Sequence, residues 1–134
     1  MFDALDIGAS GLFAQRTRMD TIAGNVAYIN TTRNEKGEPI QYRRRIAMFQ
    51  AGRGNEPGKP GVHVARIDQD PSPFQKKYDP GNKDADADGY VRYPNIDLSI
   101  EYVNMLEASR AYEANITMME TTKAMINSTL RLIA

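Results

Sequence analysis

The 134-residue sequence contains no cysteine, no tryptophan and a single histidine. Without cysteine, the chain has no disulfide framework, no thiolate metal site and no cysteine nucleophile. His63 alone gives histidine-based catalytic triads and zinc motifs little to build on. We therefore expect a protein that is not an enzyme, with no cofactor and no small-molecule substrate.

The chain also lacks an excess of charge and a long apolar run. Its 17 basic residues balance 17 acidic ones, so it has no bulk positive field of the kind that holds nucleic acid or an anionic membrane. No apolar run approaches the roughly 20 residues that span a bilayer, and residues 1–15 lack the pattern of a secretory signal. These absences predict no nucleic-acid partner, no membrane span and no cleaved signal peptide.

Proline divides the chain into three parts. All seven prolines fall in the middle, and both long terminal stretches are free of this helix breaker. The sequence therefore predicts an N-terminal helix in residues 1–32, an irregular or β-rich middle over 33–96, and a C-terminal helix over 97–134. The length fits one domain of a mainly α class, with the two terminal helices forming a coiled coil.

The N-terminal stretch has apolar residues at alternating steps of three and four, which is the spacing of a coiled-coil seam. Glycines inside a helix cost about 1 kcal/mol each relative to alanine, so Gly8, Gly11 and Gly24 indicate that another backbone approaches closely there. The apolar seam members are Leu5, Leu12, Met19, Ile22, Val26 and Ile29, with Gly8 and Gln15 at the two remaining positions.

The C-terminal stretch shows the same spacing for more than four heptads, after Asn95 or Asp97 as a candidate cap. A second stripe, from Met118 to Leu132, runs beside the seam, so one partner helix cannot cover all of this surface. The apolar seam members are Tyr102, Met105, Tyr112, Ile116, Met119, Ile126, Leu130 and Ile133, with Ser109 and Lys123 between them. We predict that both sets of seam residues form an assembly interface.

Energetic bookkeeping supports assembly. Pairing the two helices within one chain buries about 14 large side chains, worth on the order of 2 kcal/mol each. Ordering the backbone costs about 1–2 kcal/mol per residue, which hydrogen bonds only roughly offset. We infer a marginal monomer whose terminal helices become ordered on assembly.

The middle segment contains short strand patterns at residues 42–50, 62–68 and 90–93, separated by Gly- and Pro-rich clusters. Residues 76–81 indicate a turn. His63 lies within the second pattern, where it is expected to be a strand residue rather than a ligand.

Residues 84–89 match the opening of a calcium-binding loop, because Asp84, Asp86 and Asp88 are followed by Gly89. The match then fails, since Asn95 occupies the position where a bidentate glutamate closes such a loop. We expect a solvated acidic turn. A soluble coiled-coil binding adaptor with a calcium-responsive loop remains an alternative function.

Arg43, Arg44 and Arg45 can grip phosphates, which leaves a nucleic-acid-binding module as a third hypothesis. In a strand, however, alternation sends Arg44 to one face and the other two to the opposite face. We expect these arginines to be solvated edge charges or to form salt bridges with neighbouring subunits.

Several motifs resemble a known family. The segments Ser10-Gly11-Leu12, Ile22-Ala23-Gly24-Asn25-Val26-Ala27 and Asn30-Thr31-Thr32 resemble the N-terminal signature of the rod, hook and hook-associated proteins of the bacterial flagellum. Residues 93–97, 107–115 and 125–130 are similar to the C-terminal signature of the proximal rod proteins of that family. One departure is Tyr28, where the family usually carries Asn.

The resemblance implies a structural subunit of the flagellar basal-body rod, the torque-transmitting shaft that crosses the periplasm around the export channel. Its implied partners are other rod proteins, copies of itself, and the membrane-ring and export-gate-proximal components of the basal body. The resemblance also implies export through the flagellar type III apparatus, without a cleaved signal peptide.

Overall fold

The computed structural model describes residues 2–39 and 41–134 of the chain. Met1 and Ile40, inside the predicted N-terminal and middle segments, lie outside the described residues. The elements follow in the order α1 (Phe2–Ala27), β1 (Arg45–Ala51), β2 (Val62–Gln69), β3 (Gln75–Tyr78), β4 (Tyr90–Tyr93) and α2 (Leu98–Ile133).

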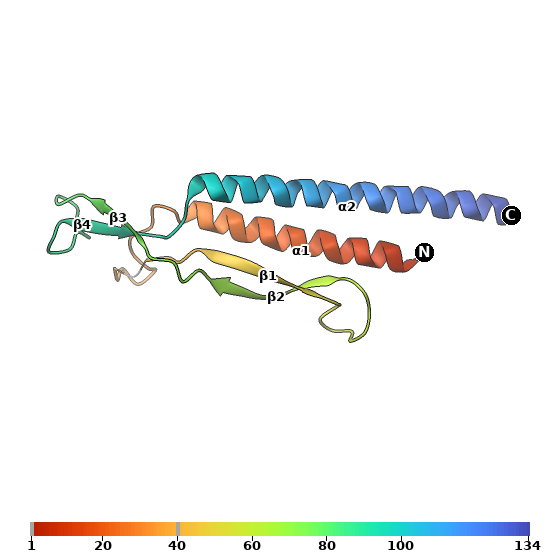
Figure 1. Ribbon diagram of the computed structural model, residues 1–134, viewed down its shortest axis with the longest axis horizontal. Coiled ribbons are helices and arrows are strands. Elements are labelled where there is room, and N and C mark those ends of the chain that lie inside the picture. Colours follow the sequence, from red (N-terminus) through yellow and green to blue (C-terminus); the bar gives the residue numbers. More distant parts are fainter. Residues whose placement is uncertain (1, 40) are drawn as a thin grey trace.

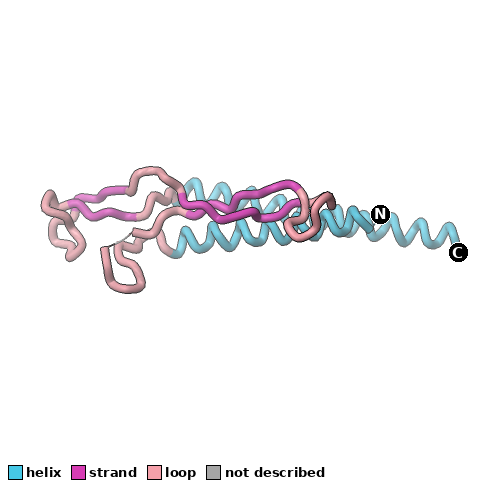
Figure 2. The backbone as a smooth tube through the Cα atoms, turned by 90° about the horizontal axis from the view of Figure 1, so that it is seen from below, coloured by secondary structure: helices cyan, strands magenta, loops and turns pink. Residues whose placement is uncertain are grey.

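The molecule is elongated, and its two helices lie side by side and antiparallel (Figure 1). The β1–β2 hairpin lies along α1, so that α1 contacts α2 on one side and this hairpin on another. The β3–β4 hairpin stands beyond the helices at the far end of the molecule, as the second view also shows (Figure 2). Two terminal helices and a small antiparallel-strand middle are therefore confirmed as the architecture.

The start of α2 is set by Asp97, one of the two predicted caps. Its side chain accepts a hydrogen bond from the Ser99 backbone nitrogen at 2.9 Å, which satisfies one of the free donors of the first turn. The other candidate, Asn95, has a different role: its amide nitrogen donates to the backbone oxygens of Asp70 and Ser72, each at 3.0 Å.

The end of α1 comes earlier than the seam spacing indicated. The helix stops at Ala27, and Ile29 lies in the turn that follows, where the Thr31 backbone nitrogen donates to the Tyr28 carbonyl at 3.1 Å. Tyr28, the departure from the family pattern, stacks its ring on Tyr42 with centroids 4.8 Å apart. A tyrosine at this position therefore fastens the helix end to the segment before β1.

The strands agree with the sequence patterns in part. β2 and β4 lie where they were predicted, and β1 begins three residues later than its pattern. The turn predicted at residues 76–81 is confirmed only at its end, residues 79–81, because β3 occupies its first part and pairs antiparallel with β4. The pairing is supported by an edge-on contact between Tyr78 and Tyr90 and by Lys77 over the Tyr93 ring. These cross-strand contacts leave no periodic signal in a four-residue, lysine-rich segment.

Two helix glycines mark where α2 approaches α1. A Cβ at Gly8 would lie 2.7 Å from Met119 Cγ, and one at Gly11 would lie 2.9 Å from the Asn115 side-chain nitrogen. At Gly24 the nearest atom would be the Tyr42 hydroxyl at 3.9 Å. Another segment therefore approaches α1 closely at Gly8 and Gly11 but not at Gly24. The approaching atoms belong to side chains of α2 and not to its backbone.

Gly8→Val is expected to lower the free energy of unfolding by about 1–3 kcal/mol, because the added carbons overlap Met119 and force a shift at the helix contact. Gly24→Ala, the matched control, should instead raise stability by roughly 0.5–1 kcal/mol, since its Cβ would make only an ordinary van der Waals contact, 3.9 Å from the Tyr42 hydroxyl. Urea unfolding followed by circular dichroism measures both. A Gly8→Val variant as stable as wild type would contradict the close approach.

Candidate assembly interface

The antiparallel helices meet along a continuous row of contacts. Small residues of α1 face larger ones of α2 at one end of the row, and polar side chains meet at the other end. The contacting pairs, in order along α1, are Gly8 with Met119, Gly11 with Asn115, Met19 with Ser109, and Asn25 with Glu101.

The predicted seam of α1 lies on or beside this row. Ile22 is buried, with 5% of its surface exposed. The remaining members are half-buried: Leu5, Leu12, Met19, Val26 and, beyond the helix end, Ile29.

The predicted seam of α2 coincides with the row only at alternate positions. Its half-buried members are Met105, Tyr112, Met119 and Ile126. At the intervening positions, the side chain that faces α1 is one residue earlier than predicted: Glu101 and Ala108 are fully buried, whereas Tyr102 is 64% exposed. The same shift places Asn115 and Thr122 in half-buried positions beside the more exposed Ile116 and Lys123.

This shift has a chemical reason. Glu101, Asn115 and Thr122 are polar and Ala108 is small, whereas Tyr102 and Ile116 beside two of them are large and apolar, so a search for large apolar residues at this spacing selects the neighbouring row. Several large apolar side chains of α2 consequently face solvent in the single chain. The predicted seam members among them are Tyr102, Ile116, Leu130 and Ile133, with 64%, 36%, 58% and 78% of their surface exposed.

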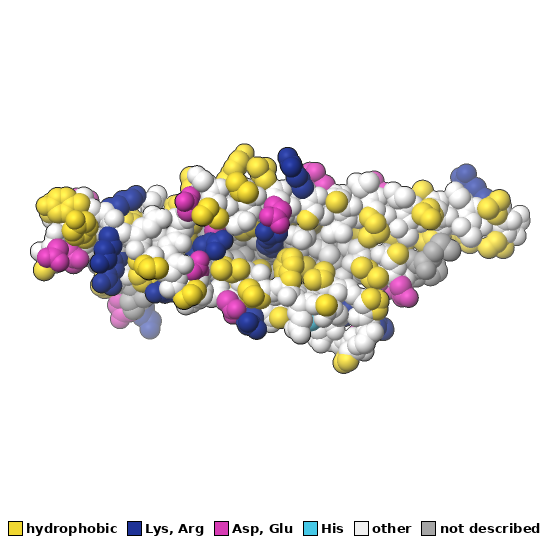
Figure 3. Space-filling view, viewed as in Figure 1, with side chains coloured by type: hydrophobic (Ala, Val, Ile, Leu, Met, Phe, Trp, Pro, Cys, Tyr) yellow, Lys and Arg dark blue, Asp and Glu magenta, His cyan; other side chains and the backbone are white. Residues whose placement is uncertain are grey.

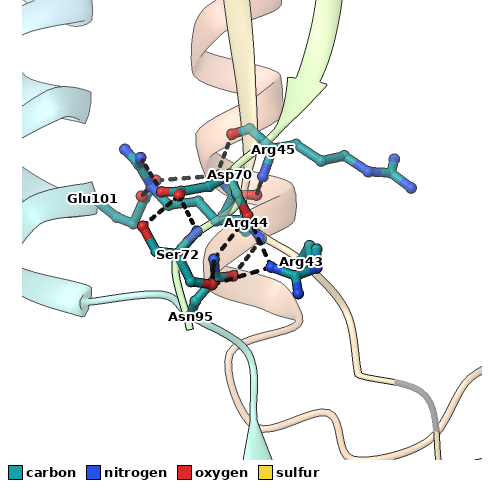
Figure 4. A network of polar contacts seen from close by, with 8 residues as sticks. Arg43, Arg44, Arg45, Asp70, Ser72, Asn95 and Glu101 are labelled. Atoms are coloured by element: carbon teal, nitrogen blue, oxygen red, sulfur yellow. Dashed lines mark hydrogen bonds and ion pairs between the residues drawn. The ribbon is translucent and has the colours of Figure 1, made fainter. Parts of the chain in front are cut away.

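A buried polar network joins the helices to the middle segment (Figure 4). Glu101 is fully buried, and its carboxylate pairs with the Arg44 guanidinium. Arg44 also pairs with Asp70 at 3.3 Å, and its backbone nitrogen donates to Asn95 Oδ1 at 2.9 Å. A buried charge is tolerated only when it is paired and hydrogen-bonded, and here each partner comes from a different segment.

Asn25 completes the network from α1. Its amide nitrogen donates to the Arg45 carbonyl at 2.8 Å and to Glu101 at 3.2 Å, and its side-chain oxygen accepts from the Arg45 backbone nitrogen at 2.9 Å. The Tyr42 hydroxyl also donates to that oxygen, at 3.2 Å. A fully buried asparagine thus satisfies the backbone at the start of β1 and binds the first turn of α2.

Sequence reasoning did not identify this network. An acidic residue in the first turn of a helix, such as Glu101, is ordinarily explained by the helix dipole, and Asn25 was noted only as part of the family signature. The sequence did contain a signal: Asn25 and Glu101 are polar residues that directly precede the seam positions Val26 and Tyr102. A polar residue that is buried at such a place requires a partner.

The three arginines at positions 43–45 make different kinds of contact, and these do not follow the alternation of a strand. Only Arg45 belongs to β1. Arg44 forms ion pairs within the chain, which corrects the expectation of solvated or intersubunit charges at this position. Arg43 donates to the backbone oxygens of Asp70 and Ser72 at 3.1 and 3.0 Å.

The acidic turn engages its carboxylates locally. Asp84 accepts hydrogen bonds from Arg33 Nε at 2.6 Å and from the Thr32 hydroxyl at 2.7 Å. Asp86 accepts from the backbone nitrogens of Asp88 and Tyr90 at 3.0 and 2.9 Å. Over residues 2–39 and 41–134, no group of three or more His, Asp or Glu side chains is arranged to hold a metal ion. His63 lies in β2, as expected, with its Nδ1 2.7 Å from the Gly52 carbonyl oxygen.

The network shifts the protonation equilibria of its members. Burial alone would lower the pKa of Arg44, but hydrogen bonds and charge from Glu101 and Asp70 outweigh it, so this pKa is raised. Hydrogen bonds from the Ser72 hydroxyl and backbone amide, with a contribution from Arg44, lower the pKa of Asp70. In the acidic turn, Arg33 and Thr32 lower the pKa of Asp84.

Both helical ends match families of known proteins. Residues 5–33 match the family described as "Flagella basal body rod protein", and residues 87–132 match "Flagellar basal body rod FlgEFG protein C-terminal". The second match spans β4 and nearly all of α2. The matches define the class of protein as a flagellar basal-body rod protein.

Relatives that match over nearly their full length identify the family within this class. The chain is 39% identical to the flagellar basal-body rod protein FlgC of Bacillus subtilis (strain 168), with 98% of this chain and 97% of the relative covered. It is 42% identical to FlgC of Aquifex aeolicus (strain VF5), over 96% and 94%, and 38% identical to FlgC of Salmonella typhimurium (strain LT2), over 98% and 97%. The chain belongs to the FlgC family of flagellar basal-body rod proteins.

In the part of the chain that the structure describes, neither helix is long and apolar enough to serve as a membrane span.

Glu101→Ala is expected to cost about 3–5 kcal/mol of stability, because it leaves the Arg44 charge largely enclosed without its main partner. The matched control is Glu107→Ala on the same helix, where a 67% exposed carboxylate lies 3.5 Å from Arg18 and should contribute less than about 1 kcal/mol. The double variant Arg44→Met/Glu101→Leu should recover most of the loss. Equal unfolding midpoints in urea for both single variants would contradict the role of the network.

Asp70 should make folding sensitive to acid. Because its folded pKa is lowered, its stabilising contribution is present at neutral pH and is lost as the pH falls below about 4, through the lowered folded value. Asp70→Asn should cost about 1 kcal/mol at pH 7 and flatten the dependence of unfolding free energy on pH between about 5 and 2. Ser72→Ala should produce part of the same flattening. Unchanged slopes in both variants would refute the assignment.

Proposed function

We propose that this protein is a structural subunit of the bacterial flagellar basal-body rod and that it assembles through α1 and α2 into the shaft around the export channel. The observation that carries the proposal is the apolar face that α2 exposes in the single chain. This face includes predicted seam members and a second stripe, whose apolar members are Met118, Met125 and Leu132, exposed by 37%, 61% and 87%.

The second stripe is more apolar than its composition indicates. Thr122 and Thr129 lie between its members, and their hydroxyls donate to the Met118 and Met125 carbonyl oxygens, each at 2.9 Å. Because these hydroxyls are satisfied within the helix, the two half-buried threonines present mainly methyl groups beside the exposed members of the stripe, and Thr122 also borders the contact with α1. Such a surface is suited to burial against further helices.

The terminal segments and the middle segment of the sequence have different proposed roles in the rod. Residues 1–32 and 97–134 form a coiled-coil domain that lines the inner tube of the rod, and residues 33–96 form an outer piece that contacts neighbouring subunits. The support is the register of α1 on α2, which already leaves the outer faces of the helix pair unpartnered. Burial of apolar side chains among several neighbours supplies the driving force for assembly.

The proposed neighbours are other rod proteins, further copies of this chain, and the membrane-ring and export-gate-proximal components of the basal body. The proposed location is the rod as it crosses the periplasm, reached through the flagellar type III apparatus without a cleaved signal peptide. A chain without cysteine forms no disulfide during such transfer between compartments. The calcium-responsive adaptor is not supported, because the family is one of structural rod proteins and Asp84 is bound by Arg33.

Ile126→Asp tests the proposed assembly. Ile126 is half-buried, and on assembly a carboxylate there would be buried without a partner, at a cost of several kcal/mol. Cells of the source organism that carry this variant should produce the protein but not swim, and electron micrographs should show basal-body rings without a rod. The adjacent exposed position provides the control, Asn127→Asp, which should leave motility intact. Normal swimming of the Ile126→Asp strain at normal protein levels would refute the role of the seam.

A further inference from the structure

A groove of about 810 Å³ opens beside the end of α1, between the turn after the helix and the start of β1. Tyr28, Tyr42 and Phe74 supply its aromatic surface, and Arg33, Arg43 and Arg45 supply cationic side chains. Glu35 is the only acidic lining residue among the described ones. The groove therefore has a net positive charge in a chain whose overall charge is zero.

Two of its arginines have no carboxylate partner. Neither Arg43 nor Arg45 lies within 4.0 Å of a carboxylate oxygen in the described ranges 2–39 and 41–134, in contrast to Arg44 between them. The Arg43 guanidinium lies 4.2 Å from the Phe74 ring centroid, and that of Arg45 lies 5.2 Å from the Tyr42 centroid. Stacking on an aromatic face holds a guanidinium while its N–H groups remain able to bind carboxylate.

The chain carries a complementary element at its far end. The β3–β4 tip, residues 79–89, contains four aspartates and one lysine, and acidic side chains gather at that end of the molecule (Figure 3). Asp84 is held by Arg33 of the same chain. Asp86 and Asp88 are exposed, and neither forms an ion pair within the described residues. Within the described residues, the tip thus presents two carboxylates without an ion pair and the groove two guanidinium groups without one, although Arg43 also donates to two backbone carbonyls.

We propose that the β3–β4 tip of one copy docks into the arginine-aromatic groove of a second copy, with Asp86 and Asp88 pairing with Arg43 and Arg45. This inference rests on the proposed function, because it names a contact between neighbouring subunits. The tip and groove are different surfaces, so the contact is heterologous and can repeat from copy to copy. Such charge pairs are salt-sensitive and individually weak, which suits a contact that the helices hold at high effective concentration.

Cysteine cross-linking tests the contact, because the wild-type chain has no cysteine to interfere. One full-length copy carries Ala87→Cys at the tip, and a second copy, distinguished by a mass tag, carries Gln69→Cys. Gln69 lines the groove and is the strand partner of Arg45. On mixing at low salt, the disulfide-linked heterodimer should form at least fivefold more than with Ser128→Cys, an exposed position on α2.

Charge reversal decides whether the arginines are responsible. Arg45→Glu on the groove copy should reduce the cross-link to the Ser128→Cys level, and adding Asp88→Lys to the tip copy should restore it. Arg66→Glu, an exposed arginine of the same hairpin outside the groove, should have no effect. Circular dichroism checks that each variant keeps its helices.

Three results would overturn the proposal: a cross-link no higher than the Ser128→Cys control, one unaffected by Arg45→Glu, or a loss that Asp88→Lys does not reverse. An acidic segment of another protein in the groove would give the first result. Rod assembly by the wild-type chain in cells is measured separately. The cross-linking experiment can therefore refute this contact while the proposed function is retained.

Discussion

Glu101 carries a charge into the most enclosed part of the molecule, and the side chains that compensate for it come from other segments. Arg44 reaches it from the segment just before β1, and Asn25 reaches it from the end of α1. Because an uncompensated buried carboxylate is strongly unfavourable, these segments must come together whenever Glu101 is buried. The relative placement of both helices and the β1–β2 hairpin therefore depends on this interaction, which also anchors the backbone at Arg45.

The contact between the helices has a different character from this network. At its other end Gly8 and Gly11 let α2 side chains approach closely, and among the described residues the buried apolar set is small. Large apolar residues such as Leu132 and Tyr102 instead face outward on α2. A chain that uses small and polar residues inside and keeps its large apolar residues outside gains most of its hydrophobic stabilisation from neighbours, which is the energetic pattern of a subunit.

The sequence predicted part of the candidate interface, and the physical reason for the errors is specific. Met105, Tyr112, Met119 and Ile126 are half-buried in the single chain, and their role in assembly stays a prediction. The intervening positions were displaced by one residue, because the side chains at the buried positions are polar (Glu101, Asn115 and Thr122) or small (Ala108). The partners of Arg44 were also not predictable, since Asp70 and Glu101 are distant in sequence and only folding brings them together.

The sequence by itself determined the two terminal helices, the strand-containing middle and the flagellar family, because proline placement, three-four periodicity and the terminal motifs are local in the chain. Only the tertiary structure decided which face of α2 meets α1, that Gln75–Tyr78 is a strand, and that the arginine triplet is divided between a buried ion pair and an open groove. These features depend on contacts between residues far apart in the chain, and a one-residue rotation of a helix or a four-residue strand pairing leaves no periodic trace in sequence.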